Sequence, residues 1–340
     1  MSFKDLLTVF FLRHPSLKDL ARSALTHKFV VNNAAYKTFV LKKANAYAQK
    51  YPQGVMGVAI ENTINCNAKC IMCFHSVRTL TGTMSMDLFK KIVDDCVSHG
   101  ITMISISVYG EPLVDPFFLE RIEYLRGKNL NYGFLTNGQL LDNKMALALF
   151  KLGGLKQIHF SVCGYDKEVY EKIMPGLNRD VSYENIRNFL ELKKRHKGTE
   201  PRVSVSTVKV NENKKDLRKY IKFWQAQKGV DFIVAVDLWD RAGDKDMSHV
   251  GRIDRCGQKN KWMVPCKRLW GDIIIYFDGR VAPCCRDNDL REWVIGDIRK
   301  QNLSEIYNSD EMNHLRRLHL EGKRAVHPMC GKCPNNSFWF

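Results

Sequence analysis

The chain has 340 residues, 45% of them hydrophobic and 26% charged, which is enough for one large domain and a smaller one. No apolar run approaches the roughly eighteen residues of a membrane-spanning helix, and no cleavage site follows the apolar run at 6–12, so we expect a cytoplasmic protein. The formal net charge of +17 suggests an acidic partner, such as a phosphorylated substrate, an anionic membrane, nucleic acid or an acidic electron carrier, unless the basic surface only aids solubility.

Residues 1–52 form a basic segment of helical character. Nine Lys and Arg stand against two Asp, which gives 9 − 2 = +7. We predict a helical extension that covers the domain that follows. Docking of a peptide or partner and contact with a membrane surface are the alternatives.

From residue 53 to about 242, short β-prone runs alternate with helical segments. This pattern predicts an α/β fold with a parallel sheet, here a partial (β/α)6 barrel. In such barrels the chemistry takes place at the carboxyl ends of the strands. CNAKCIMC follows the first run, YGEP the second and NG the third. The expected strands span 55–63, 101–108, 131–136, 156–162, 202–210 and 230–238.

The alternation stops in the last part of the chain, which we predict to be a small domain over 243–340. DIIIYFDGRVAPCC predicts a β-hairpin that turns at Asp278 and Gly279. A polar helix is expected over about 303–320, and the chain ends in CGKCPNNSFWF.

Eleven cysteines, an odd number without a secretion signal, argue against a disulfide framework. Three of them, Cys66, Cys70 and Cys73, have the spacing CxxxCxxC. Soft thiolates select zinc, copper or iron–sulfur clusters. Three ligands leave one position open, which marks catalytic rather than structural metal sites. A structural zinc site completed by His75 is the alternative.

CNAKCIMC resembles the CxxxCxxC signature of the radical S-adenosylmethionine (SAM) enzymes. The resemblance implies a [4Fe–4S] cluster on Cys66, Cys70 and Cys73, with the amino and carboxylate groups of SAM on the fourth iron. It also implies reductive cleavage of SAM to methionine and a 5′-deoxyadenosyl radical, which takes a hydrogen atom from the substrate.

Further stretches are similar to the SAM contacts of this family. Gly110-Glu111-Pro112 is similar to the GGE stretch, whose carboxylate is expected to face the SAM amino group, with Tyr109 in place of the first glycine. Met72 stands where the family usually has an aromatic residue beside adenine, and Phe74 is expected to share that role. Thr136, Asn137 and Ser161 stand where the family contacts the methionine and ribose of SAM.

A second set of cysteines runs from Cys266 through Gly279 to Cys284, and then to Cys330 and Cys333. The hairpin brings the first two cysteines together, and the CxxC pair can complete a closed four-thiolate site for zinc or a [4Fe–4S] cluster. The order C-x12-G-x4-C and C-x2-C resembles the twitch form of the SPASM extension of radical SAM enzymes. That resemblance implies one auxiliary [4Fe–4S] cluster able to accept an electron, with structural zinc as the alternative.

Four cysteines remain outside these sets. Cys163 follows the fourth strand, and we expect its thiol to face the substrate space, either as a passive lining or as a hydrogen donor of the kind that radical SAM epimerases use. Cys96 and Cys285 are expected to pack, and Cys256 to be a free thiol. Asp166 and Arg241 are weaker candidates for polar contacts with the substrate.

The sequence therefore predicts a radical SAM enzyme with two [4Fe–4S] clusters that oxidises or epimerises a C–H centre of a polar, sugar-like or phosphorylated metabolite. A radical maturase of a ribosomally made peptide is the second hypothesis, although we see no leader-binding β-hairpin before the barrel. A non-enzymatic zinc or nucleic-acid-binding protein is the third, and aromatic residues do not interleave with basic ones as in stacking platforms. The expected redox partner is an acidic electron donor such as flavodoxin or ferredoxin.

Overall fold

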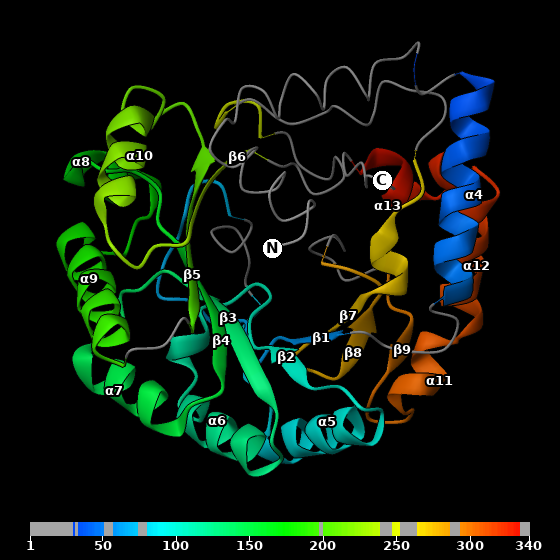
Figure 1. Ribbon diagram of the computed structural model, residues 1–340, viewed down its shortest axis with the longest axis horizontal. Coiled ribbons are helices and arrows are strands. Elements are labelled where there is room, and N and C mark those ends of the chain that lie inside the picture. Colours follow the sequence, from blue (N-terminus) through cyan, green and yellow to red (C-terminus); the bar gives the residue numbers. More distant parts are fainter. Residues whose placement is uncertain are drawn as a thin grey trace.

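One sheet of nine strands organises the protein, in the order β6-β5-β4-β3-β2-β1-β7-β8-β9 (Figure 1). The computed structural model describes residue 30 and residues 33–50, 57–73, 80–196, 200–238, 247–251, 264–285 and 293–333. Strands β1 to β6 are all parallel to their neighbours, and helices cover the outside of the sheet. The predicted α/β fold is confirmed. The domain boundaries near 52 and 242 stay predictions.

The strands of the parallel part follow the predicted order. They are β1 Gly57–Ile60, β2 Met103–Ser105, β3 Asn131–Thr136, β4 Leu155–Ser161, β5 Arg202–Lys209 and β6 Phe232–Asp237. The first two are shorter than expected, because the chain leaves the sheet early to form the loops described below.

Several of the helices between these strands begin and end at residues that cap helices. Ser85 caps α5 by accepting a hydrogen bond from Leu88 N, and Gly100, with φ +70°, lies just past its end. The helices are α5 Met86–Ser98, η2 Pro112–Val114, α6 Phe118–Gly127, α7 Asn143–Leu152, α8 Lys167–Ile173, α9 Arg179–Arg195 and α10 Leu217–Ala226.

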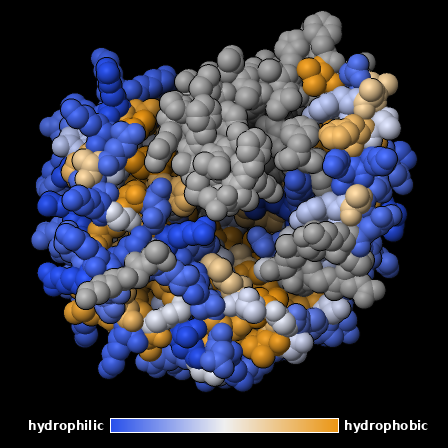
Figure 2. All heavy atoms as spheres, in the orientation of Figure 1, coloured by the Kyte–Doolittle hydropathy of each residue, from blue (hydrophilic) through white to orange (hydrophobic). Residues whose placement is uncertain are grey.

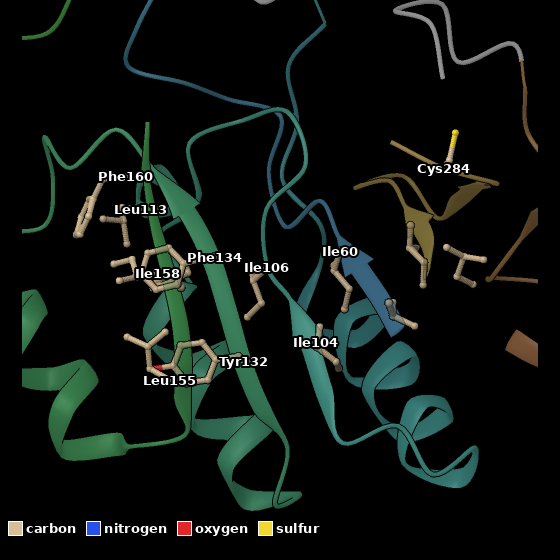
Figure 3. Close-up of a cluster of buried hydrophobic side chains, with 14 of the residues drawn as sticks. Ile60, Ile104, Ile106, Leu113, Tyr132, Phe134, Leu155, Ile158, Phe160 and Cys284 are labelled. Atoms are coloured by element: carbon tan, nitrogen blue, oxygen red, sulfur yellow. The ribbon is translucent and has the colours of Figure 1, made fainter. Parts of the chain in front are cut away.

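The hydrophobic core lies between the sheet and these outer helices (Figure 3). Ile60, Ile104, Phe134, Ile158 and Phe160 are fully or almost fully buried there. Side chains alternate across a strand, so the residues between them point to the inner face of the barrel.

The predicted hairpin forms, and it extends the barrel sheet. β7 Asp272–Ile275 pairs in parallel with β1, and β8 Arg280–Ala282 returns antiparallel after a turn at Gly279, where φ is +90°. Gly57 faces Asp272 in this pairing, and a Cβ at Gly57 would lie 2.3 Å from Asp272 Oδ1. A side chain at position 57 would therefore require the Asp272 carboxylate to move.

The rest of the C-terminal part consists of short elements around this hairpin. The predicted helix over 303–320 is two helices, because Asn302 and Ser309 each provide an N-cap. The elements are η4 Lys267–Trp270, β9 Gly296–Asp297, α11 Leu303–Tyr307, α12 Asp310–Leu320, η5 Arg324–Val326 and α13 Pro328–Lys332.

The described part of the N-terminal extension is one helix, α4 Ala34–Lys50, and it lies beside α12 (Figure 1). Val40 and Ala44 are fully buried, and Lys267 Nζ lies 5.9 Å from the centroid of the Tyr47 ring. The helix therefore packs on the C-terminal part, whereas we expected a cover for the barrel.

Hydrophilic side chains dominate the outer rim of the face in Figure 2. Among the described residues, no helix is both long and apolar enough to cross a membrane.

A buried ion pair lies in the chain after β2, and a hydrogen bond joins it to the chain after β1. Arg121 Nε donates to Asp115 Oδ2 at 2.7 Å, and both side chains are completely buried. Asp115 also accepts from Asn62 Nδ2 at 2.8 Å and from Phe117 N at 2.9 Å. Three donors, one from the chain after β1 and two from the chain after β2, thus depend on one carboxylate.

We expect Asp115→Ala to lower the free energy of unfolding by about 3–5 kcal/mol, because it leaves the Arg121 charge buried without its partner. Urea denaturation of the apo-protein measures this. The control is Asp94→Ala, which breaks the exposed pair with Lys128 and should cost less than about 1 kcal/mol. Equal effects of the two substitutions would contradict the prediction.

Candidate functional site

The loop with the three cysteines is fixed by backbone contacts with the segment after α8. Lys69 N donates to Pro175 O at 2.8 Å, and Ile71 N donates to Ile173 O at 3.0 Å. Gly176 has φ +95°, and a Cβ there would lie 2.7 Å from Asn67 O. The loop therefore has a defined shape before any metal binds.

Burial raises the pKa of two of the three thiols. It raises the pKa of Cys66 to about 12 and that of Cys70 well above its usual value, and negative charge on Cys73 would raise both further. This mutual influence means that the three sulfurs lie near one another. Without metal the Cys66 and Cys70 thiols stay protonated at neutral pH, so metal binding must displace their protons.

The buried carboxylate of Glu111 joins the loops after β2 and β3. Its Oε1 accepts from Thr136 Oγ1 at 2.7 Å and from Leu113 N at 3.3 Å, while Oε2 accepts from Asn137 N at 2.8 Å. Burial raises the pKa of Glu111 to about 7, and the three donors oppose the rise. In this structure the carboxylate binds protein donors, and its expected contact with the SAM amino group stays a prediction.

Asn137 connects this network to the cysteine loop. Its Nδ2 donates to Asn67 Oδ1 at 2.8 Å, and its Oδ1 accepts from Gln139 N at 2.9 Å. Asn67 lies between the first two cysteines. Residues from the carboxyl ends of β1, β2 and β3 are therefore bonded to one another at one edge of the sheet, as the sequence predicted.

Gly110 is where the second loop touches the first. A Cβ at this position would lie 2.3 Å from Thr63 O and 2.7 Å from Asn65 O, and Glu111 N donates to Asn65 O at 2.9 Å. Only glycine permits this approach.

The other predicted SAM contacts lie in the same region. Met72 is half-buried and packs against the core, and Pro112 is buried at the start of η2. Ser161 is the last residue of β4 and pairs with Ser206 of β5. Phe74 and His75 lie outside the described residues.

Cys163 is completely buried in this structure, and the expected place of its thiol at the substrate space stays a prediction. Its Sγ accepts from Val208 N at 3.4 Å, and its backbone N–H points to Met174 Sδ at 3.3 Å. Burial raises the pKa of the thiol. The Cys163 side chain faces β5, where the backbone N–H of Val208 serves as its hydrogen-bond donor.

The remaining minor candidates are mostly structural. Cys96 is buried in α5 and Cys285 packs against the hairpin, as predicted. Asp166 pairs with Lys219 at 2.6 Å, which makes it a surface ion pair. Arg241 and Cys256 lie outside the described residues.

The second cysteine set surrounds one pocket. Cys266, Cys284, Cys330 and Cys333 all line it, and Figure 3 places Cys284 beside the β7–β8 hairpin. In the described part of the chain, no three Cys, His, Asp or Glu side chains are close enough to hold a single metal ion. A [4Fe–4S] cluster binds each thiolate to a different iron, so it does not require the four sulfurs to meet at one point.

Two arginines give the surroundings of this pocket a positive charge, one of them buried and one exposed. Arg324 lines the pocket, and Arg268 lies near Cys266, Cys284 and Cys285. His319 Nδ1 accepts from Cys266 N at 2.9 Å, and burial lowers the pKa of His319 to about 2, so the ring is neutral.

Tyr109 connects the two sites. Its hydroxyl donates to Cys285 O at 3.3 Å, and its ring stacks on that of Tyr276 with centroids 6.3 Å apart. The next residue is Gly110 of the first site, and Cys285 follows the ligand candidate Cys284. The departure from the family's first glycine thus places a side chain between the two cysteine sites.

Sequence reasoning missed a polar group on the inner face of the barrel. The two ring nitrogens of His159 lie 2.6 Å from Ser204 Oγ and 2.6 Å from Ser206 Oγ. Its neighbours Ile158 and Phe160 are buried in the core, so His159 points inward. Burial lowers the pKa of His159. The period-two alternation of KQIHFSV and RVSVSTVKV was the signal that could have located this group.

Family models match both parts of the chain. The model of the radical SAM superfamily matches residues 60–223, and that of the SPASM iron–sulfur cluster-binding domain matches residues 266–334. The protein is thus a radical SAM enzyme with a SPASM-type C-terminal domain, which confirms the predicted family. The two domains imply SAM and iron–sulfur clusters as cofactors.

Individual proteins with similarity to this chain have different functions. The tungsten-containing aldehyde ferredoxin oxidoreductase cofactor-modifying protein of Pyrococcus furiosus is 24% identical over 310 residues, covering 81% of this chain and 86% of that protein. The SAM-dependent 2-deoxy-scyllo-inosamine dehydrogenase of Niallia circulans is 24% identical over 288 residues, covering 82% of this chain and 93% of that one. SuiB of Streptococcus suis, solved with its precursor peptide SuiA, shares the fold with a TM-score of 0.66 at 14% identity, covering 98% of this chain and 85% of SuiB.

We expect Gly110→Ala to destabilise the protein by about 1–3 kcal/mol and to lower the iron content of the first site, because its Cβ would meet the fixed backbone of residues 63–65. Urea denaturation and iron analysis measure the two effects. The control is Gly127→Ala at the end of α6, where the added Cβ meets nothing within 4 Å and should be neutral or stabilising by up to about 1 kcal/mol. A stable, fully loaded Gly110→Ala protein would contradict the assigned role of Gly110.

Proposed function

We propose that the protein uses two [4Fe–4S] clusters and SAM to oxidise a C–H centre of a polar, sugar-like metabolite. The observation that carries this proposal is the bonded network of Asn67, Glu111 and Asn137 beside the three thiols. Glu111 and Asn137 lie in stretches similar to the family's SAM contacts, and the network gives them one fixed geometry relative to the cysteine loop. The similarity to a dehydrogenase over 82% of this chain supports the reaction class.

At the first site, Cys66, Cys70 and Cys73 would hold the first cluster, and the loops after β2 to β4 would hold SAM. SAM bound to the reduced cluster supplies a 5′-deoxyadenosyl radical. Glu111 and Asn137 fix the relative positions of the cysteine loop and the expected methionine contacts at Thr136 and Asn137. Met72 is available beside the expected adenine position.

At the second site, Cys266, Cys284, Cys330 and Cys333 would hold the auxiliary cluster. All four ligands come from the protein, so this site is closed and suited to accepting an electron. The contact between Tyr109 and Cys285 O keeps it next to the first site. An electron acceptor at a fixed place favours oxidation over epimerisation, and the burial of Cys163 supports the same choice.

The inner face of the barrel supports a hydroxyl-bearing substrate. His159 is held by Ser204 and Ser206, and its lowered pKa keeps the ring neutral at neutral pH. Both ring nitrogens are engaged by the serine hydroxyls, and each hydroxyl keeps a further hydrogen-bonding position that a substrate hydroxyl group can use. A phosphorylated substrate would need cationic contacts from elsewhere in the chain.

Other partners follow from charge and similarity. The net charge of +17 suits an acidic electron donor such as flavodoxin or ferredoxin. A peptide substrate is the second candidate, because the structural similarity to peptide-bound SuiB covers 98% of this chain. Contact of the basic N-terminal extension with a membrane surface stays a hypothesis.

Anaerobic reconstitution should give about eight irons per chain, about four for each cluster, and 5′-deoxyadenosine should form from SAM under dithionite. Replacing Cys66, Cys70 and Cys73 by Ala should leave about four irons and abolish 5′-deoxyadenosine. Replacing Cys330 and Cys333 should also leave about four but retain SAM cleavage. Cys96→Ala, buried in α5, is the control and should keep all the iron. Zinc without iron, or SAM cleavage by the triple variant, would refute the proposal.

Cys163→Ala should form 5′-deoxyadenosine at a rate within about twofold of wild type, because the buried thiol has no role in SAM cleavage. With 2-deoxy-scyllo-inosamine as the first probe substrate in D2O, we expect an oxidised product without solvent deuterium at the reacting carbon, in both proteins. Deuterium that appears in the wild-type product and disappears with Cys163→Ala would instead assign the thiol as hydrogen donor and the reaction as epimerisation. Mass spectrometry distinguishes these outcomes.

A further inference from the structure

A buried arginine lies among the four cysteines of the second site. Arg324 is 1% exposed, and its side chain lines the pocket together with Cys266, Cys284, Cys330 and Cys333. It is the first residue of the short helix η5, which comes shortly before the CxxC pair in the chain.

Main-chain carbonyls hold the arginine in place. Nη1 donates to Val264 O at 2.7 Å, and Nη2 donates to Cys333 O at 3.1 Å. Val264 precedes the ligand candidate Cys266 in the chain, so the guanidinium ties the two ends of the ligand set together. Nε is buried without a hydrogen-bond acceptor.

The positive charge of Arg324 has no carboxylate partner among the described residues. Its titratable neighbours there include His319, which is neutral, and the thiol of Cys330. A buried cation is costly unless an anion balances it. The pocket that it lines is the place where four thiolates would supply that anion.

A cluster bound by four thiolates carries a net negative charge, which increases by one on reduction. A buried cation beside it stabilises the reduced form more than the oxidised form, and low exposure keeps solvent from screening the effect.

We propose that Arg324 is the buried counter-charge of the auxiliary cluster and raises its reduction potential, so that it accepts an electron readily. This inference rests on the proposed function. Reduction adds one electron to the cluster, and no Fe–S bond forms or breaks. During turnover the donor is the carbon-centred substrate radical, which also loses a proton to base and so becomes the oxidised product.

Two other arginines provide contrasts. Arg268 also lines the pocket, but it is exposed, so solvent and salt screen its charge. Arg316 on α12 is buried like Arg324 and donates to Leu269 O at 3.0 Å and Tyr307 O at 2.8 Å. It does not line the pocket, which makes it a matched control for the loss of a buried arginine.

The experiment measures the auxiliary cluster alone, in the full chain with Cys66, Cys70 and Cys73 replaced by Ala. Reductive titration followed by electron paramagnetic resonance gives the midpoint potential of Arg324→Gln, Arg324→Lys and Arg316→Gln. We expect Arg324→Gln to lower the equilibrium constant for reduction at least tenfold, or about 59 mV for one electron. Arg324→Lys and Arg316→Gln should stay within about threefold of the parent.

The outcomes separate charge from structure. If Arg324→Lys assembles the cluster and Arg324→Gln does not, the charge is required for assembly, which also supports the proposal. Equal potentials for the Gln and Lys variants, or failure of both to assemble the cluster, would overturn it in favour of a purely structural tie. Absence of an iron–sulfur cluster in the parent would instead refute the proposed function, because that result does not depend on Arg324.

Discussion

The buried carboxylate of Glu111 is the contact on which the first site depends. It accepts three hydrogen bonds from the loops after β2 and β3, and Asn137 transmits the constraint to Asn67 in the cysteine loop. A buried carboxylate is tolerated only when donors satisfy it, so the donors are held as firmly as the acid. Gly110 adds a steric constraint, because the chain before Glu111 lies directly on residues 63–65. The three thiols therefore have a fixed position relative to the expected SAM contacts.

The pairing of β7 with β1 extends this constraint to the second site. The cysteine loop follows β1, and the β7–β8 hairpin leads to Cys284, so both sites are attached to neighbouring strands of one sheet. The hydrogen bonds between the paired strands fix the distance between the two sites far better than a flexible linker would. Tyr109 reinforces the connection through Cys285 O. Electron transfer between substrate and auxiliary cluster benefits from such fixed spacing, because neither site must move to meet the other.

Much of this organisation could be predicted from local sequence signals. The strand and helix periodicity, the Ser85 cap and the turn at Gly279 depend on residues close in the chain, and each is present. The cysteine sets were identified by spacing and family resemblance. The β1–β7 pairing joins distant segments, and nothing in DIIIYF specifies its partner. Cys163 and Arg324 show the same limit, since the first lies just past a strand and the second in the polar stretch EGKRAVH, where burial has no local signature.

The two sites present similar thiolates in opposite electrostatic surroundings. Near the first, the ionised form of Glu111 disfavours added negative charge and already raises the pKa of Cys66. Near the second, Arg324 favours added negative charge and opposes the rise in the pKa of Cys330. A cluster beside a buried anion is harder to reduce than one beside a buried cation, because reduction adds negative charge to both. On the proposed assignment, the first cluster is therefore the stronger reductant, as cleavage of SAM requires, and the auxiliary cluster is the better acceptor. The sign of one buried charge beside each set of cysteines would then give the direction in which electrons move through the enzyme.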